Sequence, residues 1–342
     1  MKISWLSRLG IALFVAPAAL AHDLHVDPKL GLDLPDRGSA TSPFRTLSYA
    51  CARAAATDTV RLAEGVYDQA SGETFPIDLR PGVTLTGSTP ATTRIEHAGP
   101  GPAILVEGAH GIGATTIREL TVALDGAHPT SLAIESSHSV TLNRCRIVGG
   151  SEGLLYLPGD HPTPDVLRIE DSWFLHQQSL SVDVRVASNG TVPSEVVFSR
   201  NLVLGGDVSV TLAEDLPGAL ANGSIVIAAN TLAGGSGLLA NQSWTSPDMR
   251  PRSAQWLIKE NRITSSSGTG LDFEYAMQGS ALRAELDVLI EANTISGLLG
   301  GVRTACAGTS LPGVSTAEIS IAYNDFQGTT SGLEIVIDPP TS

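Results

Sequence analysis

Apolar residues alternate with polar ones in short runs along most of the chain, and one sequence pattern within this alternation recurs. The pattern has two apolar residues separated by one residue. Three positions after the second apolar residue comes a position that we call the slot, and two positions after the slot comes another apolar residue. Five copies carry Asn in the slot: Val196-x-Phe198-x-x-Asn201-x-Val203, Ile225-x-Ile227-x-x-Asn230-x-Leu232, Trp256-x-Ile258-x-x-Asn261-x-Ile263, Val288-x-Ile290-x-x-Asn293-x-Ile295 and Ile319-x-Ile321-x-x-Asn324-x-Phe326. Period-two alternation in such short runs predicts strands rather than helices.

The pattern also has earlier copies, with Leu120, Cys145 and Ser172 in the slot, and successive slots lie 25, 27, 29, 29, 31, 32 and 31 residues apart. A second short strand follows each slot. A period near 30 with several strands per repeat favours a β-solenoid, in which each turn buries its apolar face by stacking on its neighbours. The alternative is a β-sandwich or a propeller, but propeller repeats rely on aromatic signatures and only 5% of this chain is aromatic. We therefore predict an all-β, single-stranded parallel β-helix.

Asn is suited to the slot for two reasons. It tolerates the left-handed backbone conformation that a sharp turn between strands needs, and stacked side-chain amides can bond from one turn to the next.

The front of the chain has a different pattern. Ser42-Pro43 supplies a helix N-cap and a first-turn proline, and Phe44, Leu47, Cys51 and Ala54 then fall on one face of a helix that runs to about Ala56. We expect this amphipathic helix to cover the open end of the first turn of the solenoid, which would otherwise be an unpaired edge.

Residues 25 to 88 resemble a known family. They are similar to the N-terminal module of pectin-lyase-like β-helix proteins, and most similar to a secreted family known only as a domain of unknown function. The resemblance rests on His25-Val26-Asp27, Gly38-Ser39, Pro43-Phe44-Arg45-Thr46-Leu47, Asp58-Thr59-Val60, Glu64-Gly65-Val66-Tyr67, Gly72-Glu73-Thr74-Phe75-Pro76 and Gly82-Val83-Thr84-Leu85. It implies a right-handed parallel β-helix but no particular chemistry, because this opening precedes lyases, hydrolases, epimerases and noncatalytic surface proteins.

The first residues predict a secretory signal peptide. Lys2 and Arg8 precede an apolar run from Leu9 to Leu20, and Ala19-Leu20-Ala21 offers a small-x-small cleavage site. The run is too short to span a membrane, so no transmembrane segment is expected. We therefore predict a signal peptide over 1–21, an N-terminal cap with its helix over 22–57 and the β-helix over 58–342, in a secreted or periplasmic protein.

Charge limits the partners. The chain carries 21 Lys and Arg against 35 Asp and Glu, a net charge of −14, and cleavage after residue 21 leaves 19 against 35, or −16. This excludes nucleic acid and disfavours polyanionic glycans, because attraction to either needs a basic surface. Neutral polysaccharides, cations or cell-surface proteins remain as partners of a chain that we expect to be monomeric.

The three cysteines predict no catalytic site. Cys51, Cys145 and Cys306 allow at most one disulfide. Cys145 and Cys306 would lie about 24 Å apart along the axis at about 4.8 Å per turn, far beyond bridging distance. We expect buried free thiols.

The second strand of each turn holds the first candidate site. Alignment of these strands puts Leu155, Ser181, Ser209, Leu239, Asp272, Arg303 and Glu334 in one outward column, and Leu157, Asp183, Thr211, Asn241, Glu274, Ala305 and Val336 in the next. Asp272 and Glu274 then lie about 7 Å apart. In the enzymes that the chain resembles, catalytic groups lie on such a face.

Two interpretations of this face stay open. Asp272 and Glu274 fit an acid and base pair with Arg303 as an electrostatic or proton-abstracting group. Alternatively, Asp272, Arg303 and Glu334 neutralise one another in a ladder across the turns, which we favour.

A second candidate surface consists of long loops that follow the same strand, at 158–165, 187–194, 214–222, 241–253, 276–285 and 304–315. Insertions at the same position of successive repeats stack along one side of a solenoid, and such a side is often a binding face. This edge would hold Asp160, His161, Asp165, Glu214, Asp215, Trp244, Asp248, Arg250 and Arg252. Trp244 offers a stacking platform for a sugar ring or an anchor for its own loop, and the two alternatives weigh evenly.

Enzyme motifs and a metal loop are weakly represented. Arg250-Pro251-Arg252 is only faintly similar to the pectate lyase motif and lacks its acidic partners, and the polygalacturonase motifs are absent. Asp27, Asp33 and Asp36 offer oxygen ligands for calcium, but without a recognisable ligand loop a solvated turn is favoured. No cofactor is expected, with calcium left open.

Two hypotheses follow. The first is a noncatalytic secreted β-helix that binds glycan or protein at a cell surface through its loop edge. The second is a polysaccharide lyase or glycoside hydrolase that uses Asp272, Glu274 and Arg303, with Trp244, Asp183, Arg250, Arg252 and Glu334 binding substrate. Fold analogy alone supports the second.

Overall fold

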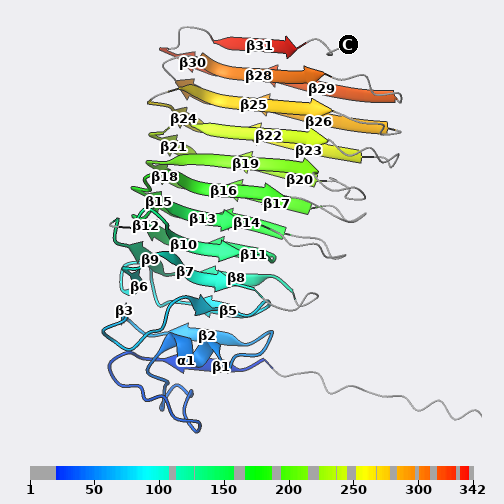
Figure 1. The fold of residues 1–342 in the computed structure, drawn as a ribbon. Coiled ribbons are helices and arrows are strands. Elements are labelled where there is room, and N and C mark those ends of the chain that lie inside the picture. The colour runs from blue at the N-terminus through cyan, green and yellow to red at the C-terminus, as the bar shows by residue number, and fades with distance from the viewer. Residues whose placement is uncertain are drawn as a thin grey trace, which may run out of the picture.

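The computed structural model describes residues 21–107, 113–126, 128–157, 166–186, 194–214, 223–235, 237–244, 252–266, 268–277, 283–296, 300–308, 314–328 and 332–338. Over these residues the chain is a right-handed parallel β-helix, as predicted. It winds upward through three parallel sheets, with sheet III facing the viewer in Figure 1. No helix in these ranges is long and apolar enough to cross a membrane.

Each turn visits the sheets in the order I, II, III. Sheet I consists of β1 (Asp23–Val26), β2 (Thr59–Leu62), β5 (Thr84–Thr86), β8 (Thr115–Arg118), β11 (Val140–Asn143), β14 (Val166–Glu170), β17 (Ser194–Ser199), β20 (Gly223–Ala228), β23 (Arg252–Lys259), β26 (Arg283–Glu291) and β29 (Val314–Ala322). Sheet II consists of β3 (Gly65–Tyr67), β6 (Thr93–His97), β9 (Thr121–Leu124), β12 (Arg146–Val148), β15 (Trp173–Leu175), β18 (Leu202–Leu204), β21 (Thr231–Ala233), β24 (Arg262–Thr264), β27 (Thr294–Ser296) and β30 (Asp325–Gln327). Sheet III consists of β4 (Ile77–Asp78), β7 (Gly101–Val106), β10 (Ser131–Ser136), β13 (Glu152–Tyr156), β16 (Leu180–Val186), β19 (Asp207–Glu214), β22 (Leu238–Trp244), β25 (Thr269–Met277), β28 (Gly300–Gly308) and β31 (Leu333–Asp338).

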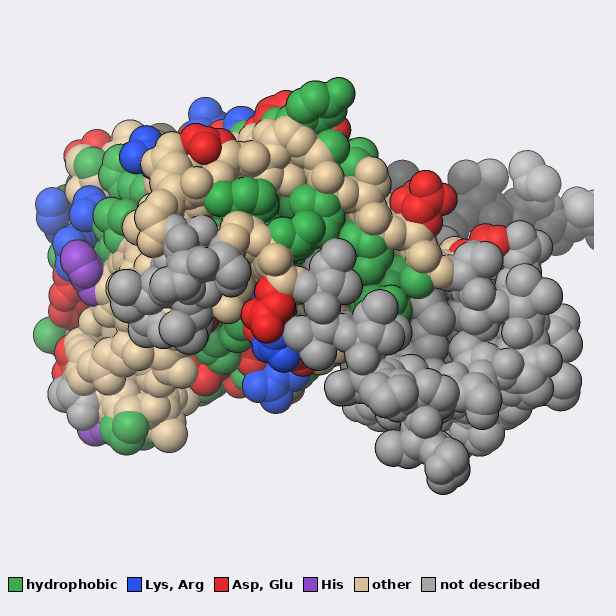
Figure 2. All heavy atoms as spheres, turned by 90° about the horizontal axis from the view of Figure 1, so that it is seen from above, with side chains coloured by type: hydrophobic (Ala, Val, Ile, Leu, Met, Phe, Trp, Pro, Cys, Tyr) green, Lys and Arg blue, Asp and Glu red, His purple; other side chains and the backbone are tan. Residues whose placement is uncertain are grey.

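The core is a column of apolar side chains enclosed by the three sheets. Val196 and Phe198 of β17 pair in register with Ile225 and Ile227 of β20, and all four are buried. Stacking of equivalent residues fills the interior turn by turn, because no single turn can bury its own apolar face. Figure 2, a view down onto the C-terminal end, shows hydrophobic side chains exposed there among polar ones.

The Asn slots form the predicted ladder. The Asn201 backbone N–H donates to Asn230 Oδ1 at 2.8 Å, and its Nδ2 donates to Ile169 O at 2.8 Å. Asn230, Asn261 and Asn293 repeat both contacts. Each side chain therefore satisfies a buried carbonyl and a buried N–H that would otherwise lack partners.

The expected left-handed conformation lies one residue earlier than predicted. The residue before each slot has a positive φ, from 51° to 57°, and these residues are Glu119, Arg144, Asp171, Arg200, Ala229, Glu260, Ala292 and Tyr323. Their side chains need not enter the core, whereas the slot side chain must. The turn and the ladder are thus divided between two adjacent residues.

Cys145 has the place of Asn in its turn. Its Sγ donates to Ile117 O at 3.3 Å, the equivalent of the carbonyl that each Asn amide reaches. Burial raises the pKa of this thiol to about 12. Cys51 is also buried, and both thiols are free, as expected; the Cys306 side chain lies outside the described part.

The capping helix is shorter than predicted. Helix α1 spans Leu47–Cys51, and its N-cap is Thr46 rather than Ser42. Phe44 instead bridges to Val26 in extended conformation. The apolar face is nevertheless the predicted one, because Phe44, Leu47, Cys51 and Ala54 are all buried.

Candidate functional site

The outward face of sheet III brings Asp272, Glu274 and Arg303 together. Asp272 pairs in register with Arg303 on the next turn, and Arg303 pairs with Glu334 on the turn after. These registers agree with the predicted column.

Arg303 contacts both carboxylates at once. Its Nη1 donates to Asp272 Oδ2 at 2.9 Å and lies 3.3 Å from Glu274 Oε1. No ion pair joins Arg303 to Glu334 within the described ranges, so the ladder that we favoured is a three-residue cluster that includes Glu274 instead. We call Asp272, Glu274 and Arg303 the sheet III cluster.

One oxygen of this cluster has no partner. Asp272 Oδ1 is buried and forms no hydrogen bond in the described part of the chain. A buried carboxylate oxygen without a partner is costly, and a functional role is one explanation for it.

Asp183 lies in a different column from the predicted one. It pairs with Leu155 and Ser209, in the column that contains Asp272, and Arg185 takes the place next to Thr211. The register shifts between Leu180 and Val182, which adds one residue to β16. This shift separates β16 from β19 only, because β16 stays in register with β13. Ser181 leaves the predicted column because the number of residues between the slot and sheet III varies, from 8 between Asn201 and Ser209 to 11 between Ser172 and Asp183.

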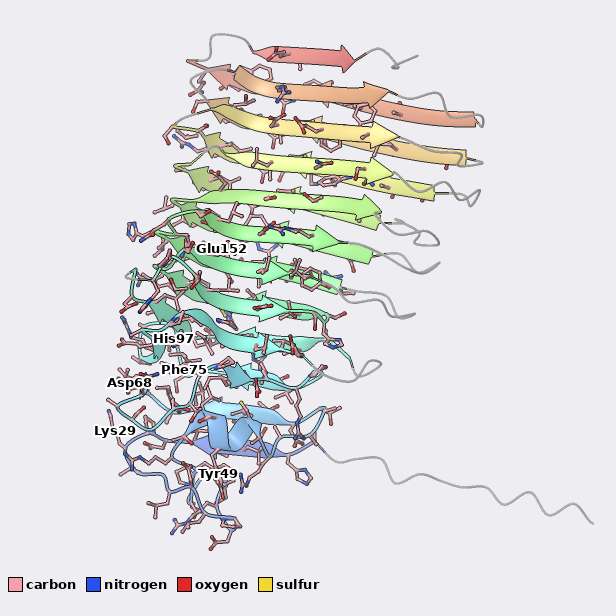
Figure 3. The ribbon with its side chains drawn as sticks, in the orientation of Figure 1. Lys29, Tyr49, Asp68, Phe75, His97 and Glu152 are labelled. Carbon is pink, nitrogen blue, oxygen red and sulfur yellow. The ribbon has the colours of Figure 1, made fainter. Side chains whose placement is uncertain are left out.

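Asp183 belongs to an acidic group lower on sheet III. Its side chain is 2% exposed and accepts a hydrogen bond from Arg185 Nη2 at 2.6 Å. The pKa of nearby Glu152 is raised, first by burial and then by the charge of Asp183. Figure 3 labels Glu152 on this sheet. The Arg185 cation compensates the buried charge of Asp183.

The predicted loop edge is only partly described. The ranges 241–253, 276–285 and 304–315 are not loops throughout, because β22, β23, β25, β26, β28 and β29 extend into them. Trp244 ends β22 and Arg252 begins β23, but their side chains lie outside the described part. Asp160, His161, Asp165, Asp215, Asp248 and Arg250 lie wholly outside it, and so does the Glu214 side chain.

Sequence reasoning missed a hollow near the N-terminus. It measures about 340 Å³ and is lined in part by Asp68, Arg94, Glu96 and His97. His97 packs on Phe75 at 4.6 Å between ring centroids, and its Nε2 lies 3.3 Å from Pro100 O. Figure 3 shows Asp68, Phe75 and His97 on the same side of the first turns.

A second missed hollow measures about 380 Å³ and includes an exposed Trp173. The sequence does contain a signal for it. Positions directly after a slot face outward, and only in the Ser172 copy does an aromatic residue stand there.

The acidic N-terminal loop is held by backbone amides. Asp27 Oδ1 accepts from the N–H groups of Lys29 and Leu30, and Asp33 Oδ1 accepts from those of Arg45 and Thr46. Among the described residues no three His, Cys, Asp or Glu side chains are placed to hold a metal ion. Asp27 and Asp33 therefore act as turn and cap residues.

Residues 30–142 match the family DUF1565, described as a protein of unknown function. This match covers α1 and the first turns, up to β11, and it confirms the resemblance of the N-terminal module. The family description assigns no activity. No curated protein shows significant sequence similarity to the chain.

Several solved structures of low sequence identity are similar to the chain. A GH136 lacto-N-biosidase from Eubacterium ramulus is 11% identical with a TM-score of 0.46, and the alignment covers 93% of this chain and 68% of that one. The A-module of the mannuronan C-5 epimerase AlgE6 from Azotobacter vinelandii is 16% identical with a TM-score of 0.38, over 83% and 91% of the two chains. The Streptococcus pneumoniae surface protein and adhesin PfbA is 11% identical with a TM-score of 0.23, over 82% and 91%.

Proposed function

We propose that this protein is a noncatalytic carbohydrate-binding β-helix that holds a neutral glycan against the outward face of sheet III, at Asp272, Glu274 and Arg303. A carboxylate presents two acceptor oxygens in a plane, and a guanidinium group presents several donor N–H groups in a plane. Each group can therefore bind two adjacent sugar hydroxyls at once. The net charge of −14 favours a neutral over a polyanionic glycan.

One observation carries the noncatalytic assignment. Arg303 contacts both Asp272 and Glu274. A glycosidase pair needs one carboxyl that holds a proton while the other is ionised. Arg303 holds both carboxylates in one ion-paired cluster, so the geometry does not set one of them apart as the proton donor, and this arrangement suits binding better than acid–base chemistry.

A second candidate function is a polysaccharide lyase or glycoside hydrolase at the same residues. The buried Oδ1 of Asp272, without a partner in the described ranges, favours it. In this alternative Asp272 is the reactive carboxylate, Arg303 stabilises developing negative charge, and Asp183 and Glu334 contact the sugar chain. The noncatalytic function is preferred because both carboxylates are ion-paired.

The proposal extends to location and to the loop edge. We propose that residues 1–21 direct the protein to the periplasm or the cell exterior, where it acts as a monomer on a polysaccharide or another cell-surface component. Trp244, Arg250 and Arg252 would extend the binding surface along the edge that follows sheet III.

The test is electrophoresis through gels that contain one of a panel of neutral or acidic polysaccharides. We expect a neutral polysaccharide to retard the wild-type protein and Arg303→Ala to lose at least tenfold in affinity. The matched control is Arg168→Ala, which breaks a 2.7 Å pair with Glu195 across turns of sheet I and should leave retardation unchanged. Equal retardation of wild type and Arg303→Ala, or no retardation at all, would refute this surface.

A further inference from the structure

The hollow that contains Trp173 lies at the corner between sheets I and II. It measures about 380 Å³, and its lining includes Pro90, Glu119, Arg144, Arg146, Asp171 and Trp173. Ligand pockets in proteins begin at about 300 Å³, so the hollow has room for one or two sugar rings.

Its charged side chains are arranged by the backbone. Glu119, Arg144, Asp171 and Arg200 occupy the left-handed position before the slot in four successive turns, with φ of 57°, 51°, 52° and 57°. A non-glycine residue in this conformation is uncommon. These four residues place acidic and basic side chains alternately along the corner between sheets I and II.

Ion pairs then fix these side chains. Arg144 Nη2 lies 2.6 Å from Glu119 Oε1. Arg200 donates from Nε and Nη2 to the two oxygens of Asp171, at 2.8 and 2.9 Å. These hydrogen bonds from Arg200 are the main reason why the pKa of Asp171 is lowered. Preorganised polar groups lose little entropy when they bind a ligand.

Trp173 provides an apolar wall beside them. Its side chain is 49% exposed, whereas Trp256 is 2% exposed and packs in the core. Arg146 lies next to it on β12, with Cζ 5.7 Å from the ring centroid. Within the described ranges Arg146 has no carboxylate partner, so its guanidinium donors are available to a ligand.

We propose that this hollow, termed the Trp173 subsite, binds a neutral hexopyranose unit of a glycan. A pyranose has an apolar C–H face, which Trp173 can cover, and a rim of hydroxyls, which the guanidinium and carboxylate groups can bind. The lining carries two cationic and two anionic side chains, Arg144 and Arg146 against Glu119 and Asp171. This balance favours a ligand without net charge.

The Trp173 subsite is distinct from the sheet III cluster. Trp173 lies on β15 of sheet II, whereas the cluster lies on β25 and β28 of sheet III, several turns farther along the axis. The inference therefore goes beyond the proposed function, and one can fail while the other holds.

The test uses the full chain and defined oligosaccharides. Calorimetry would measure binding of cellohexaose, maltohexaose and laminarihexaose as neutral probes, and of hexagalacturonate as an acidic probe. Each titration is done in the wild type and in Arg303→Ala, so that binding at the sheet III cluster is removed. We expect at least one neutral probe to bind in both backgrounds.

Trp173→Ala should then weaken that binding at least tenfold, and Arg146→Ala should weaken it by a smaller factor. Tyr323→Ala is the matched control, because Tyr323 is an exposed aromatic side chain outside the hollow, in the left-handed position before a slot. It should bind like the wild type. Thermal unfolding checks that each variant folds. If Trp173→Ala does not fold, Arg146→Ala still tests the inference.

Three results would overturn the inference: unchanged neutral binding in both Trp173→Ala and Arg146→Ala, binding of hexagalacturonate alone, or no binding of any probe in the Arg303→Ala background. Loss of polysaccharide retardation in Arg303→Ala with intact binding at Trp173 would support both sites.

Discussion

A single slot side chain joins its own turn to the turn before it, and Asn261 is the clearest case. Its Nδ2 donates to Ile227 O at 2.8 Å, and its Oδ1 accepts from the N–H of Asn230 at 3.0 Å. Both backbone groups are buried, so water cannot take the place of the side chain as their hydrogen-bond partner. The side chain therefore holds adjacent turns in register as well as filling space.

Asn261→Ala should lower the free energy of unfolding by about 2–4 kcal/mol, because each buried polar group left without a partner costs roughly 1–3 kcal/mol. Asn261→Asp should cost at least as much despite its similar shape, because an oxygen would then face the Ile227 carbonyl. Chemical denaturation measures both.

Asn241→Ala is the control, since Asn241 is half-buried on the outward face of β22 and outside the ladder. A loss for Asn261→Ala no larger than that for Asn241→Ala would contradict the structural role of the ladder.

At the scale of elements, α1 depends on a residue far from it in sequence. Glu73 is buried, and it accepts from the N–H of Leu47 at 2.6 Å and from that of Ser48 at 2.9 Å. These are first-turn amides that a five-residue helix cannot satisfy itself. Glu73 belongs to the Gly72-Glu73-Thr74-Phe75-Pro76 motif, so this contact gives that motif a structural role.

Glu73 should make stability depend on pH. Its pKa in the folded protein is raised, mainly by burial, from an ordinary 4.5. The folded protein therefore holds this proton more tightly than the unfolded chain does. The resulting stabilisation is complete below the unfolded pKa and is lost as the pH rises through the folded pKa.

Glu73→Gln tests this dependence. Between the unfolded and the folded pKa of Glu73, the free energy of unfolding of the wild type should fall as the pH rises. In Glu73→Gln this fall should be smaller, whatever the difference in absolute stability between the two proteins. Urea denaturation at a series of pH values measures both slopes. Parallel curves would show that Glu73 does not titrate differently in the folded state.

The sequence predicted the elements that repeat and failed on those that do not. The interval between Asn slots identifies the turns because the ladder imposes one residue type at one position. The column of Asp183 depends on the number of residues between the slot and sheet III, which is 11 from Ser172 to Asp183 but 8 from Asn201 to Ser209 and follows no fixed period. The helix boundary at Thr46 likewise follows from contacts with Glu73 and Asp33.

The candidate site was predicted in position but not in full. The column of Asp272, Arg303 and Glu334 follows from alternation within strands. The acid and base interpretation grouped Glu274 with Asp272 and Arg303, but the ladder that we favoured left Glu274 out, because the contact between Arg303 and Glu274 depends on side-chain conformation. Trp173 was not among the predicted site residues, although alternation with the buried Phe174 places it on the outward face.

At the scale of the molecule, the solenoid displays charge along separate faces. The cluster of Asp272, Glu274 and Arg303 lies on sheet III, and the alternating ladder that includes Arg144 and Asp171 lies at the corner between sheets I and II. A surface of this kind can contact an extended polymer at several points, and several weak contacts on one chain add up to strong retention. The fold thus suits glycan binding without requiring a catalytic centre.

The central claim is that the sheet III cluster binds a glycan without cleaving it. The most direct measurement is prolonged incubation of the protein with a panel of neutral and acidic polysaccharides, followed by assays for both new reducing ends and unsaturated products. We predict no product from any polysaccharide, including those that retard the protein in gels. Product formation that is abolished by Asp272→Ala would contradict the claim and assign the cluster to a hydrolase or a lyase.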